Sequence, residues 1–254
     1  MKNLRNDNLL NIYINNGVAV VEINRPAKRN ALNINVIKEL DHAFAQLENT
    51  PEVKVIVLRG AGDKAFAAGA DLTELASADT AFIFRSFMDT YFSICTRIME
   101  LTKPVIAAVN GYAYGGGCML ALSCDYVIAT NDSKFGQQEI NYGFFGGAAY
   151  LTSIAGKHKA AEIVMLGETF DAKEAYRIGI INQLADKDDF EEVIKKVCDK
   201  FISKSPWALN LIKKTIKLSM DSGLEPGLCY EINSIALCRQ TKESEELLKQ
   251  FAKK

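Results

Sequence analysis

Blocks of apolar and polar residues divide the first part of the chain into short elements. Two apolar-rich runs, 10–14 and 18–23, flank the Asn-Asn-Gly segment 15–17, and this arrangement predicts a β-hairpin. Residues 35–48 place apolar side chains three and four positions apart, which predicts an amphipathic helix. The run 53–58 is rich in β-branched residues and is typical of a buried strand.

Helices and strands are expected to alternate through the next hundred residues. A long apolar helix is predicted from about residue 80 to 101, followed by a strand over 104–109. A short helix is predicted over 119–123 and another strand over 125–129. This alternation favours the α/β class with a largely parallel sheet.

Beyond about residue 188 the pattern changes to helices only. Four helical segments are predicted, over 189–204, 206–220, 224–238 and 242–253. The last three carry many apolar residues, so we expect them to dock on the core of the chain or on a neighbouring subunit.

Composition limits the classes of partner. The chain has 254 residues, 48% of them apolar, and a net charge of −1, so neither nucleic acid nor an anionic membrane is an expected partner. Six cysteines without a CxxC pair, together with only two histidines, give no metal site. The sequence shows no secretory signal and no apolar run of membrane-spanning length. We therefore expect a cytoplasmic protein.

Two turns rich in small residues are the strongest candidates for a functional site. Gly115, Gly116 and Gly117 lie between the predicted strand 104–109 and the next helix, where bare backbone lets a ligand approach. The second turn, 65–71, leads into Asp71, a good helix N-cap. If both turns point to the same place, they supply two backbone N–H donors to one oxygen atom, which is an oxyanion hole.

Glu139 is the candidate acid/base. A glutamate in a loop is commonly a solvated charge, but this one is followed by apolar and glycine residues over 140–147. Burial among such groups would raise its pKa toward neutrality, which suits proton transfer.

Other reactive side chains are weaker candidates. Cys118 follows the glycines but has no histidine nearby, so we interpret it as a packed side chain. His42 and His158 lie in no motif, and the absence of a GxSxG segment argues against a serine hydrolase. The basic segment 25–30 is either a solvated loop or a phosphate clamp.

Four segments, 24–32, 64–72, 103–118 and 135–140, together resemble the crotonase (enoyl-CoA hydratase/isomerase) superfamily. The resemblance covers essentially the whole chain. It implies an α/β spiral of ββα units over residues 1–200 and a C-terminal helical trimerisation region over 201–254. It also implies an acyl-CoA thioester substrate, no metal or other cofactor, and a homotrimer or a dimer of trimers.

The resemblance also assigns roles to residues. The amides of Ala70 and Gly116 would hold the thioester oxygen, and Glu139 would transfer protons. The residues implied to contact the substrate are Arg25, Lys28, Ala68, Asp71, Leu72, Thr73, Met119, Phe251 and Lys254.

Two departures from the family pattern bear on the reaction. Hydratases of this family use two glutamates, and Met119 stands at the position of the first. Methionine cannot titrate, so the leading hypothesis is a Δ3-Δ2 enoyl-CoA isomerase that uses Glu139 alone. In the second departure, the loop 141–150 lacks the usual proline and carries aromatic residues, so its effect on the acyl pocket is open.

Three alternatives remain beside the isomerase. The first is an enoyl-CoA hydratase that works with Glu139 and without the usual first glutamate. The second is a decarboxylase or hydrolase acting on another thioester, since one fold hosts many reactions. The third, from a different functional class, is an inactive acyl-CoA-binding subunit.

Overall fold

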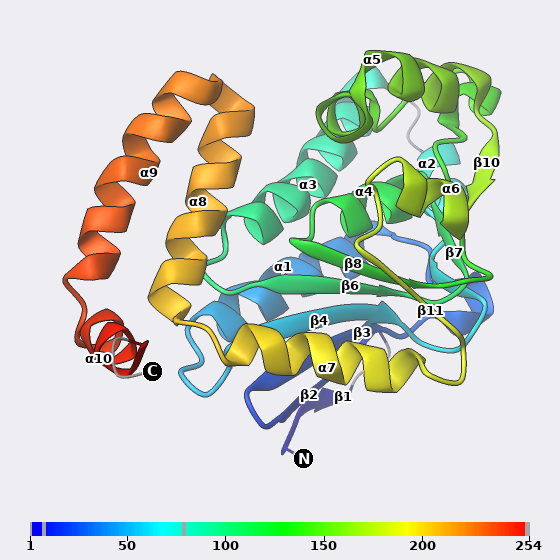
Figure 1. Ribbon diagram of the computed structural model, residues 1–254. Helices are drawn as coiled ribbons and strands as arrows, with labels where there is room; N and C mark the ends of the chain where they lie inside the picture. Colours follow the sequence, from blue (N-terminus) through cyan, green and yellow to red (C-terminus); the bar gives the residue numbers. More distant parts are fainter. Residues whose placement is uncertain (1, 7–8, 78–79, 252–254) are drawn as a thin grey trace.

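A sheet whose strands are mostly parallel forms the centre of the molecule (Figure 1). The computed structural model describes residues 2–6, 9–77 and 80–251. In these residues the central sheet has the strand order β1-β2-β3-β4-β6-β8-β11. The strands are β1 (Lys2–Asn6), β2 (Leu10–Asn15), β3 (Val18–Ile23), β4 (Val55–Gly60), β6 (Val105–Val109), β8 (Tyr126–Thr130) and β11 (Gln183–Ala185). The predicted hairpin is confirmed as β2 and β3, and from β3 to β11 all neighbours are parallel.

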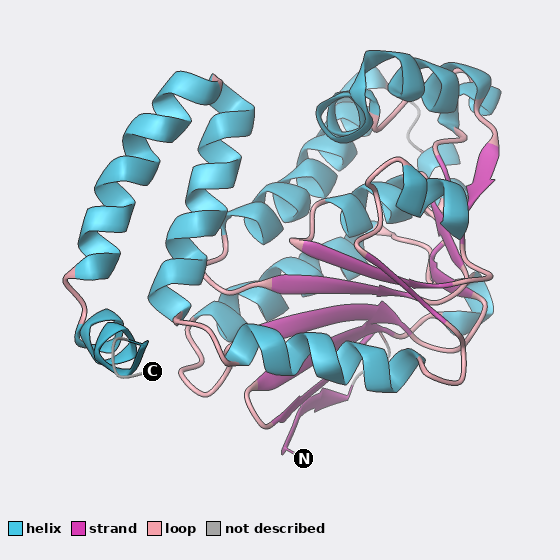
Figure 2. Cartoon of the chain, in the orientation of Figure 1, coloured by secondary structure: helices cyan, strands magenta, loops and turns pink. Residues whose placement is uncertain are grey.

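Helices cover both faces of this sheet (Figures 1 and 2). On one side lie α1 (Ile34–Glu48) and α3 (Ala81–Glu100), both close to the predicted bounds, and on the other lies α7 (Phe190–Ile202). Successive residues of β4 therefore enter different cores: Ile56 and Leu58 pack in the larger core, and Val57 packs in the core under α7. Burial on both faces explains why this strand is almost entirely apolar.

A second, smaller sheet positions the candidate site, and the sequence did not predict it. Its order is β10-β9-β7-β5. The strands are β5 (Ala65–Ala67), β7 (Tyr112–Tyr114), β9 (Lys134–Gly136) and β10 (Thr169–Asp171). Each has three residues, which is too short to show a periodic pattern. The parallel pairing of β5 with β7 brings the two small-residue turns side by side.

The C-terminal helices extend away from the core, at the left of Figure 1. The predicted helices are confirmed as α8 (Pro206–Ser222), α9 (Leu224–Arg239) and α10 (Lys242–Phe251). Exposed apolar side chains follow α8 and α9, namely Ile212, Ile216, Met220, Leu224, Leu228, Ile232, Ile235 and Leu237. The trimerisation role of this region stays a prediction. No helix in the described part of the chain is long and apolar enough to cross a membrane.

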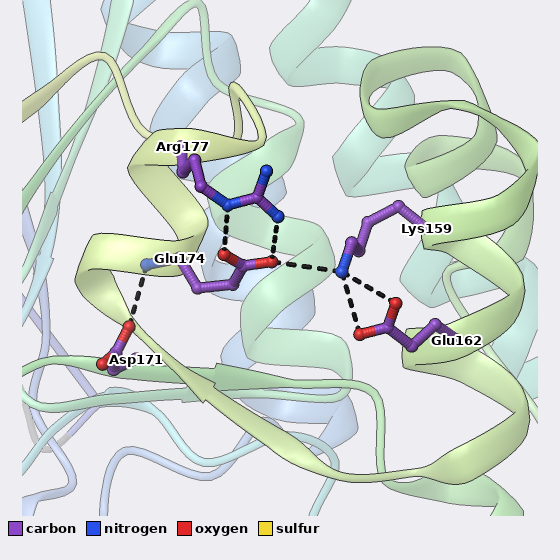
Figure 3. A network of polar contacts seen from close by, with 5 residues as sticks. All are labelled: Lys159, Glu162, Asp171, Glu174 and Arg177. Atoms are coloured by element: carbon purple, nitrogen blue, oxygen red, sulfur yellow. Dashed lines mark hydrogen bonds and ion pairs between the residues drawn. The ribbon is translucent and has the colours of Figure 1, made fainter.

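Charged side chains join α5 (Ala148–Leu166) to α6 (Ala172–Arg177) (Figure 3). The Glu174 carboxylate accepts two hydrogen bonds from Arg177, at 2.6 and 2.7 Å. It also forms an ion pair with Lys159 of α5 at 3.1 Å. These partners lower the pKa of Glu174 to about 2. The Asp171 side chain caps α6 by accepting from the amide of Glu174. The network therefore links α6 to the helix that follows the loop 141–147.

A partly buried ion pair anchors α8 to the core. The Lys213 ammonium donates to Asp125 Oδ2 at 2.7 Å and to the carbonyl of Ile98 at 2.8 Å. The same Asp125 oxygen accepts from the amide of Val105, the first residue of β6. Lys213 is only 8% exposed, whereas the Asp125 side chain is 25% exposed, so the lysine is the partner that depends more on the pair for its solvation.

We therefore predict that Lys213→Ala, which removes these hydrogen bonds but leaves Asp125 partly solvated, lowers the free energy of unfolding by about 2 kcal/mol. Lys214→Ala is the matched control, because Lys214 is exposed on the same helix and its loss should change stability by less than about 0.5 kcal/mol. Urea unfolding of both variants measures the difference. Equal midpoints for the two variants would show that the pair does not anchor α8.

Candidate active site

Each of the three consecutive glycines is approached closely by a different group. A methyl group built at Gly115 would lie 2.7 Å from Glu139 Oε1, and one at Gly117 would lie 2.0 Å from the carbonyl oxygen of Ala67. A methyl group at Gly116 would lie 3.1 Å from a ring carbon of Tyr91. A larger residue at Gly115 or Gly117 would force these neighbours apart. The glycines therefore let α4 (Gly116–Leu122) press directly against β5.

The first candidate oxyanion donor is the amide of Gly116. The helix α4 begins at this residue, three positions earlier than the predicted start at residue 119. The N–H of a first helical residue has no partner four residues back inside the helix. Gly116 also lines the cavity described below, so its amide is available to a ligand oxygen there.

The second candidate donor is the amide of Ala70. An isolated parallel bridge joins Ala70 to Leu32. This bridge uses the carbonyl of Gly69 and the amide of Asp71, at 2.8 and 2.9 Å from Leu32. In such a bridge the N–H of the central residue points to the opposite side. The two turns are adjacent, because a methyl group built at Gly69 would lie 3.7 Å from the amide nitrogen of Gly116.

Arg25 fixes the Ala70 turn rather than pointing into open solvent. Its guanidinium donates to Asp71 Oδ2 at 3.0 Å and to the carbonyl of Ala31 at 2.5 Å. Asp71 in turn caps α2 (Leu72–Ala76) by accepting from the amide of Thr73, as the sequence predicted. Burial would raise the pKa of Asp71, but the bonds from Arg25 and Thr73 outweigh it and lower the pKa. These contacts give Arg25 a positioning role, and its contact with the CoA phosphates stays a prediction.

Glu139 enters the site from the short helix η2 (Glu139–Tyr142). Its Oε1 lies against Gly115, and its Oε2 is buried without a hydrogen-bond partner in the described structure. Burial raises the pKa of this carboxyl, opposed only in part by a backbone hydrogen bond. A carboxylate that is buried and unpartnered is well suited to exchange protons with a bound molecule.

A cavity of about 130 Å³ joins these groups. Ala70, Gly116 and Glu139 all line it, and its remaining walls are mainly apolar. Met119, only 2% exposed, lies on the same side as Glu139. A methyl group built at Gly146 would lie 3.2 Å from Glu139 Oε1 and 3.7 Å from Met119 Sδ. Glu139 is the one carboxylate among the described residues that line the cavity.

The other predicted residues divide into those at the cavity and those away from it. Ala68 and Leu72 line it, whereas Thr73 is exposed outside it. Lys28 is exposed on the basic turn, where it remains a candidate for binding a phosphate. Phe251 is 79% exposed at the end of α10 and does not line the cavity. Lys254 lies outside the described residues.

Cys118 is a packed side chain, as the sequence indicated. It is fully buried, and burial raises the pKa of its thiol to about 12. The thiolate that a nucleophile needs is therefore absent at neutral pH. His42 and His158 are both exposed and do not line the cavity.

The sequence analysis did not identify two residues that support the glycine turn. The hydroxyl of Tyr91 donates to the carbonyl of Gly116, and burial raises the pKa of Tyr91 well above its ordinary value, so it stays a donor. The Gln137 side-chain amide donates to the carbonyl of Gly115 at 3.3 Å. Tyr91 lies on a helix whose pattern resembles ordinary core packing, so the sequence carried no signal for this contact.

Comparison with known proteins identifies the family of this chain. The sequence pattern of the enoyl-CoA hydratase/isomerase family matches residues 13–254. The chain belongs to this family. It is 37% identical to a short-chain-enoyl-CoA hydratase of Clostridium acetobutylicum, over 93% of this chain and 92% of the relative. It is 35% identical to the 2,3-dehydroadipyl-CoA hydratase of Escherichia coli, with the same coverage of both chains.

Solved structures of the family share the fold as well. The crystal structure of an enoyl-CoA hydratase from Bacillus anthracis matches with a TM-score of 0.91 and 30% identity. The match covers 97% of this chain and 96% of that one. The crotonase-like α/β fold expected from the four sequence segments is therefore confirmed.

The buried carboxyl of Glu139 predicts a specific pH dependence of stability. A carboxyl whose pKa is raised in the folded state favours folding below its unfolded pKa, about 4.3. It loses that contribution as pH rises through its folded pKa. We expect Glu139→Gln to raise the urea midpoint at pH 8 and to raise it much less at pH 4.5. Glu168→Gln, at an exposed position, is the control. If Glu139→Gln raised the urea midpoint equally at both pH values, the pKa of the Glu139 carboxyl would not be raised in the folded state.

Proposed function

We propose that this protein catalyses proton transfer on an enoyl-CoA thioester, with Glu139 as the acid/base. The observation that carries the proposal is the position of the Glu139 carboxylate, which lies against Gly115 in the cavity that Ala70 and Gly116 also line. In this proposal the two amides bind the thioester oxygen. They stabilise it as it gains negative charge, and one such donor contributes about 2.7–4 kcal/mol to lowering a barrier.

Hydration is the reaction that we favour. It is supported by the two curated relatives compared above, both of which are named hydratases. One carboxylate is sufficient for the proton balance. Glu139 takes a proton from water as the water oxygen bonds to C3, and the electron pair of the double bond moves through the carbonyl to the thioester oxygen. Protonated Glu139 then gives that proton to C2, which restores the carbonyl and the carboxylate.

Migration of the double bond is the second candidate, and Met119 favours it. A thioether accepts hydrogen bonds only weakly, so Met119 would not orient a water molecule as a second carboxylate does. In this reaction Glu139 removes a proton from C2 of a 3-enoyl-CoA, and an enolate forms on the thioester oxygen. The same carboxyl returns the proton at C4, which yields a 2-enoyl-CoA without a change in mass.

Two substrates distinguish these reactions. With crotonyl-CoA we expect a product one water heavier, detected by mass spectrometry and by loss of the conjugated-thioester absorbance. With a 3-enoyl-CoA, isomerisation would give a new conjugated absorbance at constant mass. Glu139→Gln should lower the rate of whichever reaction is observed at least 100-fold, and Glu168→Gln should leave that rate unchanged. Binding of both thioesters without turnover of either would instead identify an inactive acyl-CoA-binding subunit.

The pH profile of the active reaction gives an independent readout. The wild-type rate kcat/KM should fall as pH decreases through the pKa of Glu139, because hydration starts with an ionised carboxylate. Since burial raises that pKa, the fall should occur above the ordinary range of glutamate, near 4.3. A rate that stays constant down to pH 4.5 would contradict the assignment of Glu139 as the base.

We also propose that the chain assembles with copies of itself through α8 and α9, whose exposed apolar side chains need a covering surface. Light scattering on the purified protein should give three or six times the chain mass of 28.0 kDa. Ile232→Glu, on α9, should reduce that mass, whereas Tyr176→Glu, at an exposed position of α6, should not. A wild-type protein that is a monomer at micromolar concentration would refute the proposal.

A further inference from the structure

Aromatic side chains from two different elements line the cavity. Phe87 and Phe92 extend from α3, and Phe144 and Phe145 come from the loop after η2. The ring of Phe84 meets that of Phe144 edge to face, with centroids 5.7 Å apart. The two walls are therefore joined by a ring contact, and the loop that departs from the family pattern supplies one of them.

The charged residues that line the cavity limit which acyl groups it can bind. Glu139 is its carboxylate, and no lysine, arginine or histidine occurs among the described residues that line it. A second carboxylate at the far end of an acyl chain would therefore be buried without a cation, which is strongly unfavourable. The relative named 2,3-dehydroadipyl-CoA hydratase has, by its name, a substrate with such a group, so this cavity favours a different acyl class.

The size of the cavity sets a second limit. Its volume of about 130 Å³ is close to that of an engineered apolar cavity of about 150 Å³ that binds benzene. A benzene-sized group therefore matches this cavity in volume. Tyr142 and Phe145 are exposed at the edge of the cavity, so a flat group could extend across their faces. Aromatic rings pair favourably edge to face or in offset stacks.

We propose that the preferred substrate is an uncharged enoyl-CoA whose acyl group ends in a single six-membered ring conjugated to C3. The proposal rests on the enoyl-CoA function proposed above and names its substrate class. In the complex, the reacting carbons lie between Glu139 and the two amides, and the ring lies between the α3 wall and the Phe144 wall. A dicarboxylic acyl group is disfavoured by charge, and a flexible straight chain lacks the ring-to-ring contacts that the aromatic walls offer.

The test compares kcat/KM for four thioesters: cinnamoyl-CoA, crotonyl-CoA, trans-2-octenoyl-CoA and 2,3-dehydroadipyl-CoA. We expect kcat/KM for cinnamoyl-CoA to be at least ten times that for octenoyl-CoA. The value for dehydroadipyl-CoA should be the lowest of the four. Phe144→Leu should lower the ratio of cinnamoyl-CoA to crotonyl-CoA about tenfold, because it removes one ring partner. Phe82→Leu is the matched control: Phe82 is exposed on α3 outside the cavity, and the ratio should stay constant.

The outcomes separate the two proposals. Suppose that crotonyl-CoA is turned over in a Glu139-dependent way, but kcat/KM for octenoyl-CoA equals or exceeds that for cinnamoyl-CoA. This result overturns the proposed substrate class and leaves the enzyme function standing. If no thioester is turned over, the enzyme function fails. Calorimetric binding of cinnamoyl-CoA and octenoyl-CoA then still decides the preference for a ring. Should Phe144→Leu not fold, as judged by its melting temperature, Phe92→Leu on the opposite wall provides the same comparison.

Discussion

The candidate site depends on one close backbone contact, the approach of α4 to strand β5. A side chain at Gly117 would collide with the carbonyl of Ala67, so this approach requires glycine. The pairing of β5 with β7 fixes the two segments next to each other. Because the Ala70 turn follows β5 and the Gly116 amide begins α4, the same contact sets the distance between the two candidate oxyanion donors. The bond from Arg25 to Asp71 holds the outer side of this arrangement.

A buried carboxylate without a partner is the second constraint. Glu139 Oε2 has no hydrogen bond among the described residues, and burial raises the pKa of the group. Such a side chain lowers the stability of the folded state at neutral pH and is retained where function needs it. Met119 beside it adds no charge, so a single carboxylate must carry both proton transfers in the proposed reactions.

Sequence reasoning recovered most of the longer elements and the two turns, because these depend on local patterns. It missed α5, which the non-helical Gly156 interrupts. Helices such as α3 and α7 repeat apolar residues often enough to be recognised, and Asp71 and Thr80 cap their helices as local signals predict. The second sheet was missed because its strands have three residues each. Contacts between distant segments, such as Tyr91 with Gly116 and Arg25 with Asp71, leave no local pattern. The resemblance to a family supplied the spiral arrangement, which periodicity alone does not specify.

A structure of the protein with bound butyryl-CoA would test the central claim most directly. This saturated thioester keeps the carbonyl group but has no double bond to react. The account predicts its carbonyl oxygen within hydrogen-bond distance, about 2.7–3.1 Å, of both the Ala70 and Gly116 amides, with the Glu139 carboxylate facing C2. A thioester oxygen bound elsewhere, or a Glu139 carboxylate directed away from C2, would contradict it.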